Sequence, residues 1–251
     1  MLSDSQLARY HEDGFVIPDL RVPDEVLDDI KARHTRFVAA KPEYSDYCPA
    51  LLDIEPGFRA YCNRPEILDM VEQVLGPDFA LWNASFFAKP AHIGTTTPWH
   101  QDGEYWPIRP LATCTVWLAV DDSTRENGCL RVIRGSHKDR RLRPHLTNDG
   151  PGLALNRELE ASEYDESEAV DIVLEHGRMS LHDVYLLHGS EANRSAQSRR
   201  GMTMRFMPTT SVFDRQVAAE QARSLSFDHS RRQVYLMRGR DLSGKNDFTE
   251  I

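Results

Sequence analysis

From Phe79 onward the chain consists of short runs of apolar, aromatic and β-branched residues, separated by clusters of Pro, Gly, Asn and Asp. Runs of this length and composition predict strands, and the clusters predict the turns that join them. The expected strands are residues 79–88, 113–120, 129–133, 169–174, 179–187 and 202–207. Because no helical pattern separates them, the sequence predicts an all-β core, a sandwich or barrel, at about residues 79–210.

The residues before this core, about 1–78, predict helices that pack outside it. Ser3 can cap a first helix that ends at Gly14, Pro23 opens a second helix, and a third runs over residues 65–75.

The C-terminal segment, residues 218–251, begins with a helical pattern and ends in polar residues. We expect a helical extension whose last residues fray. Since the chain has no internal repeat and its length suits one hydrophobic core, it is expected to form a single domain over residues 1–251.

Charge and composition restrict the classes of partner. The net charge of −9 argues against general nucleic-acid binding, which needs Lys and Arg clustered on one face. No apolar run approaches the roughly 18 residues that span a bilayer, and the N-terminus lacks the pattern of a signal peptide. We therefore expect a cytoplasmic protein with a small-molecule partner, no nucleic acid and no membrane; the oligomeric state stays open.

The cysteines show no C-x-x-C spacing and are expected to be free thiols: Cys48, Cys62, Cys114 and Cys129.

The stretch that says most about chemistry is Pro98-Trp99-His100-Gln101-Asp102-Gly103. In an extended segment, side chains two residues apart lie on the same face, so His100 and Asp102 can converge on one metal ion while Gln101 points away. This spacing alone is a weak signal, because a lone histidine is more often a hydrogen-bonded structural residue than a ligand. A metal site here needs a second histidine from elsewhere in the fold.

His188 is the best candidate for that histidine, because it ends the predicted strand 179–187 and is followed at once by Gly189 and Ser190. Two histidines and one carboxylate bind Fe(II) on one side of its octahedron and leave positions open for a chelating co-substrate and O₂. His182 is the competitor. It lies six residues earlier, so in an unbroken strand it faces the same way and would be a pocket residue.

Arg199, eleven residues after His188, is expected to bind the co-substrate. If that co-substrate is 2-oxoglutarate, its 2-oxoacid end chelates iron and its other carboxylate needs a partner, for which a guanidinium fork is well suited. Arg200 is the alternative, since errors of one residue in register are common in sequence reading. The polar stretch 148–168 is long enough to be a lid over such a site.

The same residues occur in blocks that are typical of one family. Tyr10-His11-Glu12-Asp13-Gly14-Phe15-Val16 looks like the opening of the phytanoyl-CoA dioxygenase family of Fe(II)/2-oxoglutarate oxygenases. Three further blocks follow in the family's order: His100-Gln101-Asp102 with Tyr105-x-Pro107-x-Arg109-Pro110, then Asn127-Gly128-Cys129-Leu130 with Gly135-Ser136-His137-Lys138, then His188-Gly189-Ser190 with Asn193, Ser195 and Arg199. The chain resembles this family over most of its length.

The resemblance implies a mainly β fold with flanking helices, built on a double-stranded β-helix (jelly-roll) core. It implies a dioxygenase that uses Fe(II), 2-oxoglutarate and O₂ and couples decarboxylation of 2-oxoglutarate to hydroxylation of an aliphatic C–H bond. Position by position, it makes His100, Asp102 and His188 the iron ligands and Arg199 the anchor of the co-substrate carboxylate. The further co-substrate neighbours that it implies are Ser190, Trp117, Gln101 and Ser85.

The chain departs from the family at Gly177-Arg178, where many members have Gly-Asp. That Asp is not a ligand, so the metal assignment is unaffected. Related halogenases have a small residue at the position of Asp102, and its presence here disfavours halogenation.

The expected substrate contacts project near the iron: Tyr105, Trp106, Arg109, His182, Asp183, Tyr61, Asn63 and Arg64. Tyr105 and Trp106 fit packing at the barrel mouth equally well. If they line the pocket, they suit a cationic ammonium group and Arg109 suits an anion, which favours a small zwitterion such as an aminophosphonate or a betaine-like metabolite. The alternatives are an acyl-CoA substrate, from the family's name, and a metal-binding barrel without catalysis.

Overall fold

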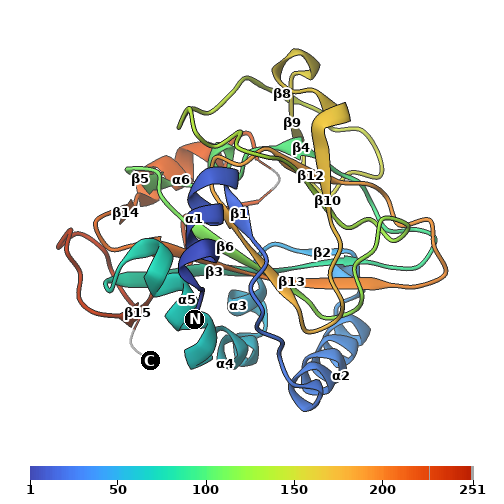
Figure 1. The fold of residues 1–251 in the computed structure, drawn as a ribbon, viewed down its shortest axis with the longest axis horizontal. Helices are drawn as coiled ribbons and strands as arrows, with labels where there is room; N and C mark the ends of the chain where they lie inside the picture. The colour runs from blue at the N-terminus through green and yellow to red at the C-terminus, as the bar shows by residue number, and fades with distance from the viewer. Residues whose placement is uncertain (226, 250–251) are drawn as a thin grey trace.

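Two β-sheets face each other in the computed structural model, which describes residues 1–225 and 227–249 (Figure 1). The larger sheet has the order β1-β11-β6-β13-β3-β15, and β2 also pairs with β3. The smaller sheet has the order β10-β7-β12-β4. The predicted fold class, a mainly β protein with a jelly-roll core and flanking helices, is confirmed.

The strands of the larger sheet are β1 (Phe15–Val16), β2 (Tyr47–Cys48), β3 (Phe79–Lys89), β6 (Cys114–Ala119), β11 (Met179–Asp183), β13 (Arg199–Pro208) and β15 (Tyr235–Arg238). Those of the smaller sheet are β4 (Thr97–His100), β7 (Leu130–Ile133), β10 (Ala169–Ile172) and β12 (His188–Ser190). Two short pairs lie outside these sheets: β5 (Ile108–Arg109) with β14 (Val212–Phe213), and β8 (His145–Thr147) with β9 (Arg157–Leu159).

The predicted bounds of the first and third helices and the predicted start of the second are confirmed, whereas two further short helices, Leu51–Ile54 and Arg59–Cys62, were not predicted. In α1 (Asp4–Asp13) the Ser3 hydroxyl accepts a hydrogen bond from the amide of Gln6, whose side chain accepts one from the amide of Ser3 in return. Gly14 ends this helix in the left-handed conformation that favours glycine, with φ 84°. The other helices are α2 (Asp24–Ala40), α3 (Leu51–Ile54), α4 (Arg59–Cys62), α5 (Pro65–Leu75) and α6 (Arg215–Gln221), with single 3-10 turns η1 (Pro42–Tyr44), η2 (Pro56–Phe58), η3 (Asp102–Glu104), η4 (Ala161–Glu163) and η5 (Glu166–Glu168).

The larger sheet has an apolar outer face and a polar inner face. On β13, Met202, Met204 and Phe206 belong to the core that α2 to α5 cover, on the side of the sheet away from the smaller sheet (Figure 1). Because side chains alternate along a strand, Thr203 and Arg205 point to the inner face. The site described below lies on this inner face, between the two sheets.

Strand register aligns the inner-face side chains in rows. One row runs across β11, β6, β13 and β3 as His182, Thr115, Arg205 and Asn83. The next row runs across the same strands as Ser180, Trp117, Thr203 and Ser85. The fold thus collects polar groups from four strands on one surface.

The predicted strand 179–187 is wrong as a single element. Only residues 179–183 form a strand, β11; residues 184–187 form a turn and a short connection, and β12 begins after them in the other sheet. The break follows from Asp183, whose carboxylate accepts a hydrogen bond from the amide of Tyr185 and whose carbonyl accepts one from the amide of Leu186. His188 therefore begins a strand of the smaller sheet and does not end a strand of the larger one.

Two other segments contain strands that the sequence did not predict. The stretch 148–168 contains β9, which forms a hairpin with β8, and its residue Leu153 makes a bridge with Thr96. The C-terminal segment is helical only in α6, and β15 then joins the edge of the larger sheet against β3. Neither strand has more than four residues, so neither carries a periodic signal that a sequence could reveal.

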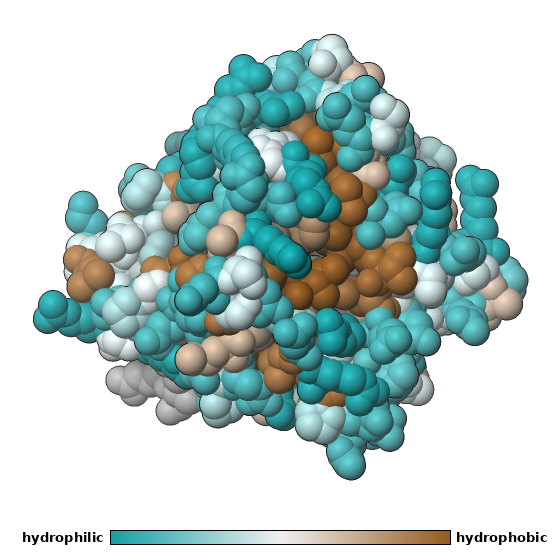
Figure 2. All heavy atoms as spheres, viewed as in Figure 1, coloured by the Kyte–Doolittle hydropathy of each residue, from teal (hydrophilic) through white to brown (hydrophobic). Residues whose placement is uncertain are grey.

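The surface of this face of the molecule is mainly hydrophilic, with apolar side chains gathered near its centre (Figure 2). No helix among the described residues is both long and apolar enough to cross a bilayer. The four cysteines are free, as predicted, and all are buried.

Candidate metal centre and active site

His100 and Asp102 converge as the spacing predicts. His100 ends β4, Gln101 stays extended with φ −113° and ψ 131°, and Asp102 opens the 3-10 turn η3. The Nε2 atom of His100 then lies 3.6 Å from Oδ1 of Asp102. Both side chains are buried, at 2% and 5% exposure.

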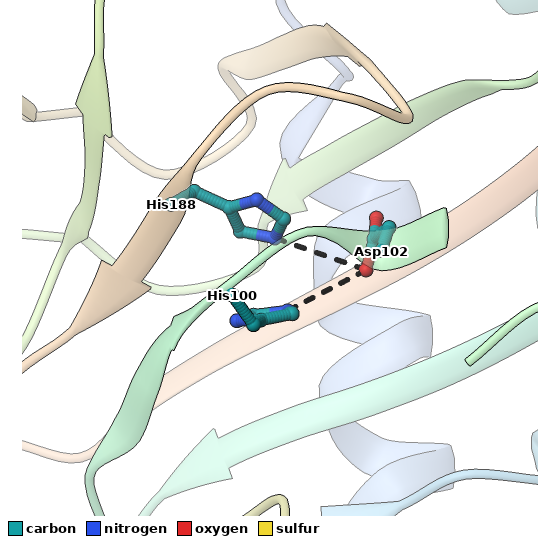
Figure 3. A group of neighbouring side chains, drawn as sticks. All are labelled: His100, Asp102 and His188. Carbon is teal, nitrogen blue, oxygen red and sulfur yellow. Dashed lines mark ion pairs between the residues drawn. The ribbon is translucent and has the colours of Figure 1, made fainter. Parts of the chain in front are cut away.

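His188 reaches the same point from the neighbouring strand. β12 pairs with β4 so that His188 is the register partner of His100, and the two imidazole rings are 4.1 Å apart. The Nε2 atom of His188 lies 3.8 Å from Oδ1 of Asp102. One ligand atom from each of the three residues lies within 4.8 Å of the other two (Figure 3), so a single metal ion can be held between them.

The surroundings prepare both histidines to be metal ligands. The Nδ1 atom of His100 lies 2.8 Å from the carbonyl of Pro98, and that of His188 lies 2.9 Å from the carbonyl of Leu186. A carbonyl only accepts, so each Nδ1 carries the proton and each Nε2 presents its lone pair to the centre. Burial and the neighbouring His100 hold the pKa of His188 well below its ordinary value, which keeps it neutral.

The carboxylate of Asp102 supplies the negative charge of the site. Burial alone would raise its pKa, but His188, His100, His182 and Arg205 together hold that pKa well below its ordinary value. Its second oxygen, Oδ2, lies 3.5 Å from Nε2 of His182 and accepts a hydrogen bond of 3.4 Å from the Thr115 hydroxyl. Two neutral imidazoles and one anionic carboxylate fit a divalent ion such as Fe(II).

A cavity of about 420 Å³, counting its opening to solvent, lies beside the triad between the two sheets. Arg199 is at its wall, 2% exposed, with its guanidinium 5.1 Å from the ring of Trp117 and bonded to the carbonyls of Phe87 and Gly128. Burial lowers the pKa of Arg199 to about 10, which leaves it charged at neutral pH. Arg200 points elsewhere and pairs with Asp121 through two nitrogen–oxygen contacts of 2.7 and 2.8 Å.

The expected co-substrate neighbours separate into two groups. Ser190 and Trp117 line the cavity beside Arg199. Ser85 lies behind it, where its hydroxyl accepts a hydrogen bond of 2.6 Å from Arg205. Gln101 is not brought to the cavity, because its amide group bonds to the backbone of Arg141, Arg143 and Tyr185.

A second, smaller cavity adjoins the first at Phe87, Asp102 and Arg205. Tyr105 and Trp106 line this second cavity, and His182 lines the first. These three are the predicted substrate contacts that the fold gathers beside His100, Asp102 and His188.

The remaining predicted substrate contacts line neither cavity. Asp183 pairs with Arg140, and Arg109 is exposed and donates to the carbonyls of Trp106 and Ile108. The 3-10 turn η3 interrupts the extended chain after Asp102, so spacing from His100 and Asp102 did not predict where Arg109 lies. Tyr61, Asn63 and Arg64 lie at and after α4, where Tyr61 bonds to Asp29 and Arg33 and Arg64 pairs with Glu66.

Arg205 was not identified from the sequence as a residue of the site. It is 4% exposed and lines both cavities. The spacing could have indicated it: Arg205 lies six residues after Arg199 on one strand, and an even spacing puts both side chains on the same face.

Two facing sheets with a two-histidine, one-carboxylate site between them define the class of jelly-roll non-haem iron oxygenases. The family model described as phytanoyl-CoA dioxygenase (PhyH) matches residues 10–201. The chain belongs to the phytanoyl-CoA dioxygenase family, as its sequence predicted, and this family consists of Fe(II)/2-oxoglutarate oxygenases.

Individual relatives agree with this membership. The chain is 32% identical over 160 residues to the phytanoyl-CoA dioxygenase domain-containing protein 1 homolog of Dictyostelium discoideum, which covers 63% of this chain and 57% of that protein. It is 30% identical over 234 residues to the peroxisomal phytanoyl-CoA dioxygenase of Homo sapiens, which covers 82% of this chain and 68% of the human protein.

Solved structures share the fold. The non-haem monooxygenase ThoJ in its apo form is 26% identical, with a TM-score of 0.74 over 96% of this chain and 86% of that one. EvdO2 from Micromonospora carbonacea, complexed with 2-oxoglutarate, is 20% identical, with a TM-score of 0.68 over 83% of this chain and 91% of that one. At that identity, the likeness to EvdO2 bears on the fold alone.

Proposed function

We propose that the protein is an Fe(II)/2-oxoglutarate-dependent dioxygenase that hydroxylates an aliphatic C–H bond of a small polar metabolite. The observation that carries this proposal is that the metal-binding triad adjoins two buried spaces. One is walled by the guanidinium of Arg199, and the other is walled by the aromatic rings of Tyr105 and Trp106. An oxygenase of this class needs separate places for its co-substrate and its substrate.

In this proposal His100, Asp102 and His188 hold Fe(II) and leave positions for 2-oxoglutarate and O₂. Arg199 pairs with the distal carboxylate of 2-oxoglutarate, and two backbone carbonyls and the ring of Trp117 fix the guanidinium in place. Ser190 contributes a hydroxyl at the same wall.

When bound, iron and 2-oxoglutarate supply the oxidising chemistry, which couples loss of CO₂ from the co-substrate to insertion of one oxygen atom into a C–H bond. The protein's part is to place the substrate and keep water out. Phe87 and Leu130 contribute apolar wall to the first cavity, and Leu155 and Phe227 do so in the second.

A small zwitterion, such as an aminophosphonate or a betaine-like compound, is the proposed substrate class. The second cavity is small and lined by the aromatic rings of Tyr47 and Tyr105, residues that can attract a cationic ammonium group. The predicted anion partner, Arg109, lies outside this cavity, so the anionic end needs another partner.

An acyl-CoA is the competing substrate class, because relatives are named phytanoyl-CoA dioxygenases. The polyanionic CoA group needs unpaired positive charge at the surface. Around the loop after β7, however, each exposed cation faces a carboxylate: Arg134 pairs with Asp13, Lys138 with Glu12, and Arg140 with Asp183. This pairing favours the small metabolite.

The experiment that tests the proposal is succinate release by the Fe(II)-loaded protein with 2-oxoglutarate and O₂, across aminophosphonates, betaines, amino acids and acyl-CoAs. Asp102→Ala is the control. Stimulation by a small zwitterion that the control lacks supports the proposal, and stimulation by acyl-CoAs alone assigns the alternative substrate.

A metal-binding barrel without catalysis is the outcome if no compound stimulates succinate release, none forms without substrate, and iron with 2-oxoglutarate gives no charge-transfer absorption without O₂. A metal enzyme that does not use 2-oxoglutarate would bind iron and stay insensitive to replacement of Arg199.

A further inference from the structure

Arg205 is a buried cation that has no anionic partner in the part of the chain that the structure describes. Its side chain lies on the inner face of β13 at the junction of the two cavities. One guanidinium nitrogen donates 2.6 Å to the hydroxyl of Ser85, while Nε has no hydrogen-bond partner among the described residues. Within residues 1–225 and 227–249, no carboxylate oxygen lies within 4.0 Å of its nitrogens.

Arg232 shows how a buried guanidinium of this chain is satisfied from within it. Arg232, also 4% exposed, pairs with Asp53 at 2.6 Å and donates to the carbonyl of Pro49. Arg199, which the proposed function pairs with a carboxylate of 2-oxoglutarate, donates to two backbone carbonyls, and its Nε, like that of Arg205, has no hydrogen-bond partner among the described residues. Burying an unpaired charge is costly, so a protein that retains one at a cavity wall has a partner for it that comes from outside the chain.

The nearest acidic group cannot be that partner. Asp102 attracts Arg205 from a distance, but its Oδ1 faces the two ligand histidines and its Oδ2 faces His182 and Thr115. Its negative charge belongs to the metal site. The second cavity has no other carboxylate among the described residues that line it.

The rest of the second cavity is suited to an anion beside this guanidinium. Arg205 lies 5.2 Å from the ring of Trp106 and 5.9 Å from that of Phe87, so its plane is held by aromatic faces. Asn83, its register neighbour on β3, offers an amide at the same wall. His229 is the other titratable nitrogen there, and burial together with Arg232 and Arg205 holds its pKa well below the ordinary value.

We propose that Arg205 binds the anionic group of the organic substrate, a carboxylate or phosphonate, at the junction of the two cavities. This inference rests on the proposed function and names the part of the substrate that the site recognises. Arg199 and Arg205 then divide the two anions between them: Arg199 takes the distal carboxylate of 2-oxoglutarate, and Arg205 takes the substrate. The anion partner that the sequence assigned to Arg109 is Arg205.

The test is a binding measurement on protein loaded with Ni(II), a redox-inactive stand-in for Fe(II), and saturated with 2-oxoglutarate. The probes are 2-aminoethylphosphonate, glycine betaine and methylphosphonate. Their controls are 2-aminoethanol and choline, which keep the amine or ammonium group and lack the anionic group. Calorimetric titrations compare the wild type, Arg205→Gln and Arg200→Gln, since Arg200 lies on the same strand and pairs with Asp121 outside both cavities.

We expect at least one anionic probe to bind the wild type and Arg200→Gln alike, and to bind Arg205→Gln about 30-fold more weakly or worse. Binding of choline and 2-aminoethanol should be the same in all three proteins. The dissociation constant of 2-oxoglutarate for Arg205→Gln should stay within about threefold of the wild type. If Arg205→Gln does not fold, Arg205→Met, which keeps the length of the side chain, takes its place.

Three results would overturn the inference. One is equal binding of the anionic probes to the wild type and to Arg205→Gln, and another is no binding of any anionic probe to the wild type. The third is a loss of 2-oxoglutarate affinity in Arg205→Gln of about 30-fold, which would assign Arg205 to the co-substrate. In all three cases the wild type still binds 2-oxoglutarate. If the wild type does not bind 2-oxoglutarate, the proposed function itself has failed.

Discussion

The Nε2 atom of His182 lies 3.5 Å from Oδ2 of Asp102, whereas His100 and His188 face the other carboxylate oxygen, Oδ1. His182 comes from the larger sheet, whereas His100 and His188 come from the smaller one. The side chain of Asp102 is therefore held from both sheets, and neither sheet alone determines its orientation.

Replacing His182 with alanine should weaken metal binding without removing a ligand. Groups that orient a ligand typically contribute about 10- to 100-fold to metal affinity. We expect a rise of that size in the dissociation constant of Fe(II) or Ni(II), measured by competition with a chelator. Ser180→Ala, on the same strand and face, is the matched control, and equal affinities of the two variants would exclude an orienting role for His182.

Arg199→Gln should raise the Michaelis constant for 2-oxoglutarate by about 30-fold or more, because it removes a buried charge that faces an anion. Arg200→Gln makes the same chemical change on the neighbouring residue, whose guanidinium pairs with Asp121. It should leave that constant within about twofold of the wild type. The reverse order of the two effects would move the co-substrate anchor to Arg200.

The parts of this fold that the sequence predicted are those with local causes. Ser3 and Gly14 end α1 through contacts within a few residues, and the apolar periodicity of residues 65–75 is complete inside α5. β1 and β15 have no such local cause, because each is short and exists only through pairing with β11 or β3. A pairing between distant strands leaves no periodic pattern in either short segment.

The site follows the same rule. The convergence of His100 and Asp102 was predictable because side chains two residues apart in an extended chain lie on the same face. The position of Arg109 was not, because the turn η3 and the pairing of β5 with β14 intervene between it and the metal ligands. Arg205 lies an even number of residues after Arg199 on β13, so the sequence could show that both side chains lie on one face of the strand. Which face points toward the smaller sheet depends on the packing of α2 to α5 against the other face.

Gly201→Ala should damage the co-substrate end of the cavity. A Cβ atom at Gly201 would lie 2.1 Å from Cζ2 of Trp117, and the backbone of Gly201 is paired on both sides, so the indole ring must move. That ring lies 5.1 Å from the guanidinium of Arg199. We expect a loss of about 1–3 kcal/mol in the free energy of unfolding, together with weaker 2-oxoglutarate binding.

A double-mutant cycle isolates this clash from other effects of the substitution. Trp117→Phe shortens the ring that Gly201→Ala displaces, so the double variant should lose less stability than the sum of the two single variants. Strictly additive losses in urea unfolding would show that the clash is relieved elsewhere.

His34 should make stability depend on pH between about 6.5 and 4. It is 4% exposed on α2 against Phe86, and burial, with a contribution from Arg200, lowers its pKa to about 4. In this interval the unfolded chain binds a proton that the folded protein excludes, so protonation favours unfolding as pH falls. The stabilising effect of a neutral His34 is complete above about pH 6.5 and is lost progressively toward pH 4, by about 2 kcal/mol at pH 5.

His34→Phe cannot be protonated, so its free energy of unfolding should fall less than that of the wild type between pH 7 and pH 5, measured in urea. Parallel losses in both proteins would assign the acid sensitivity to other groups.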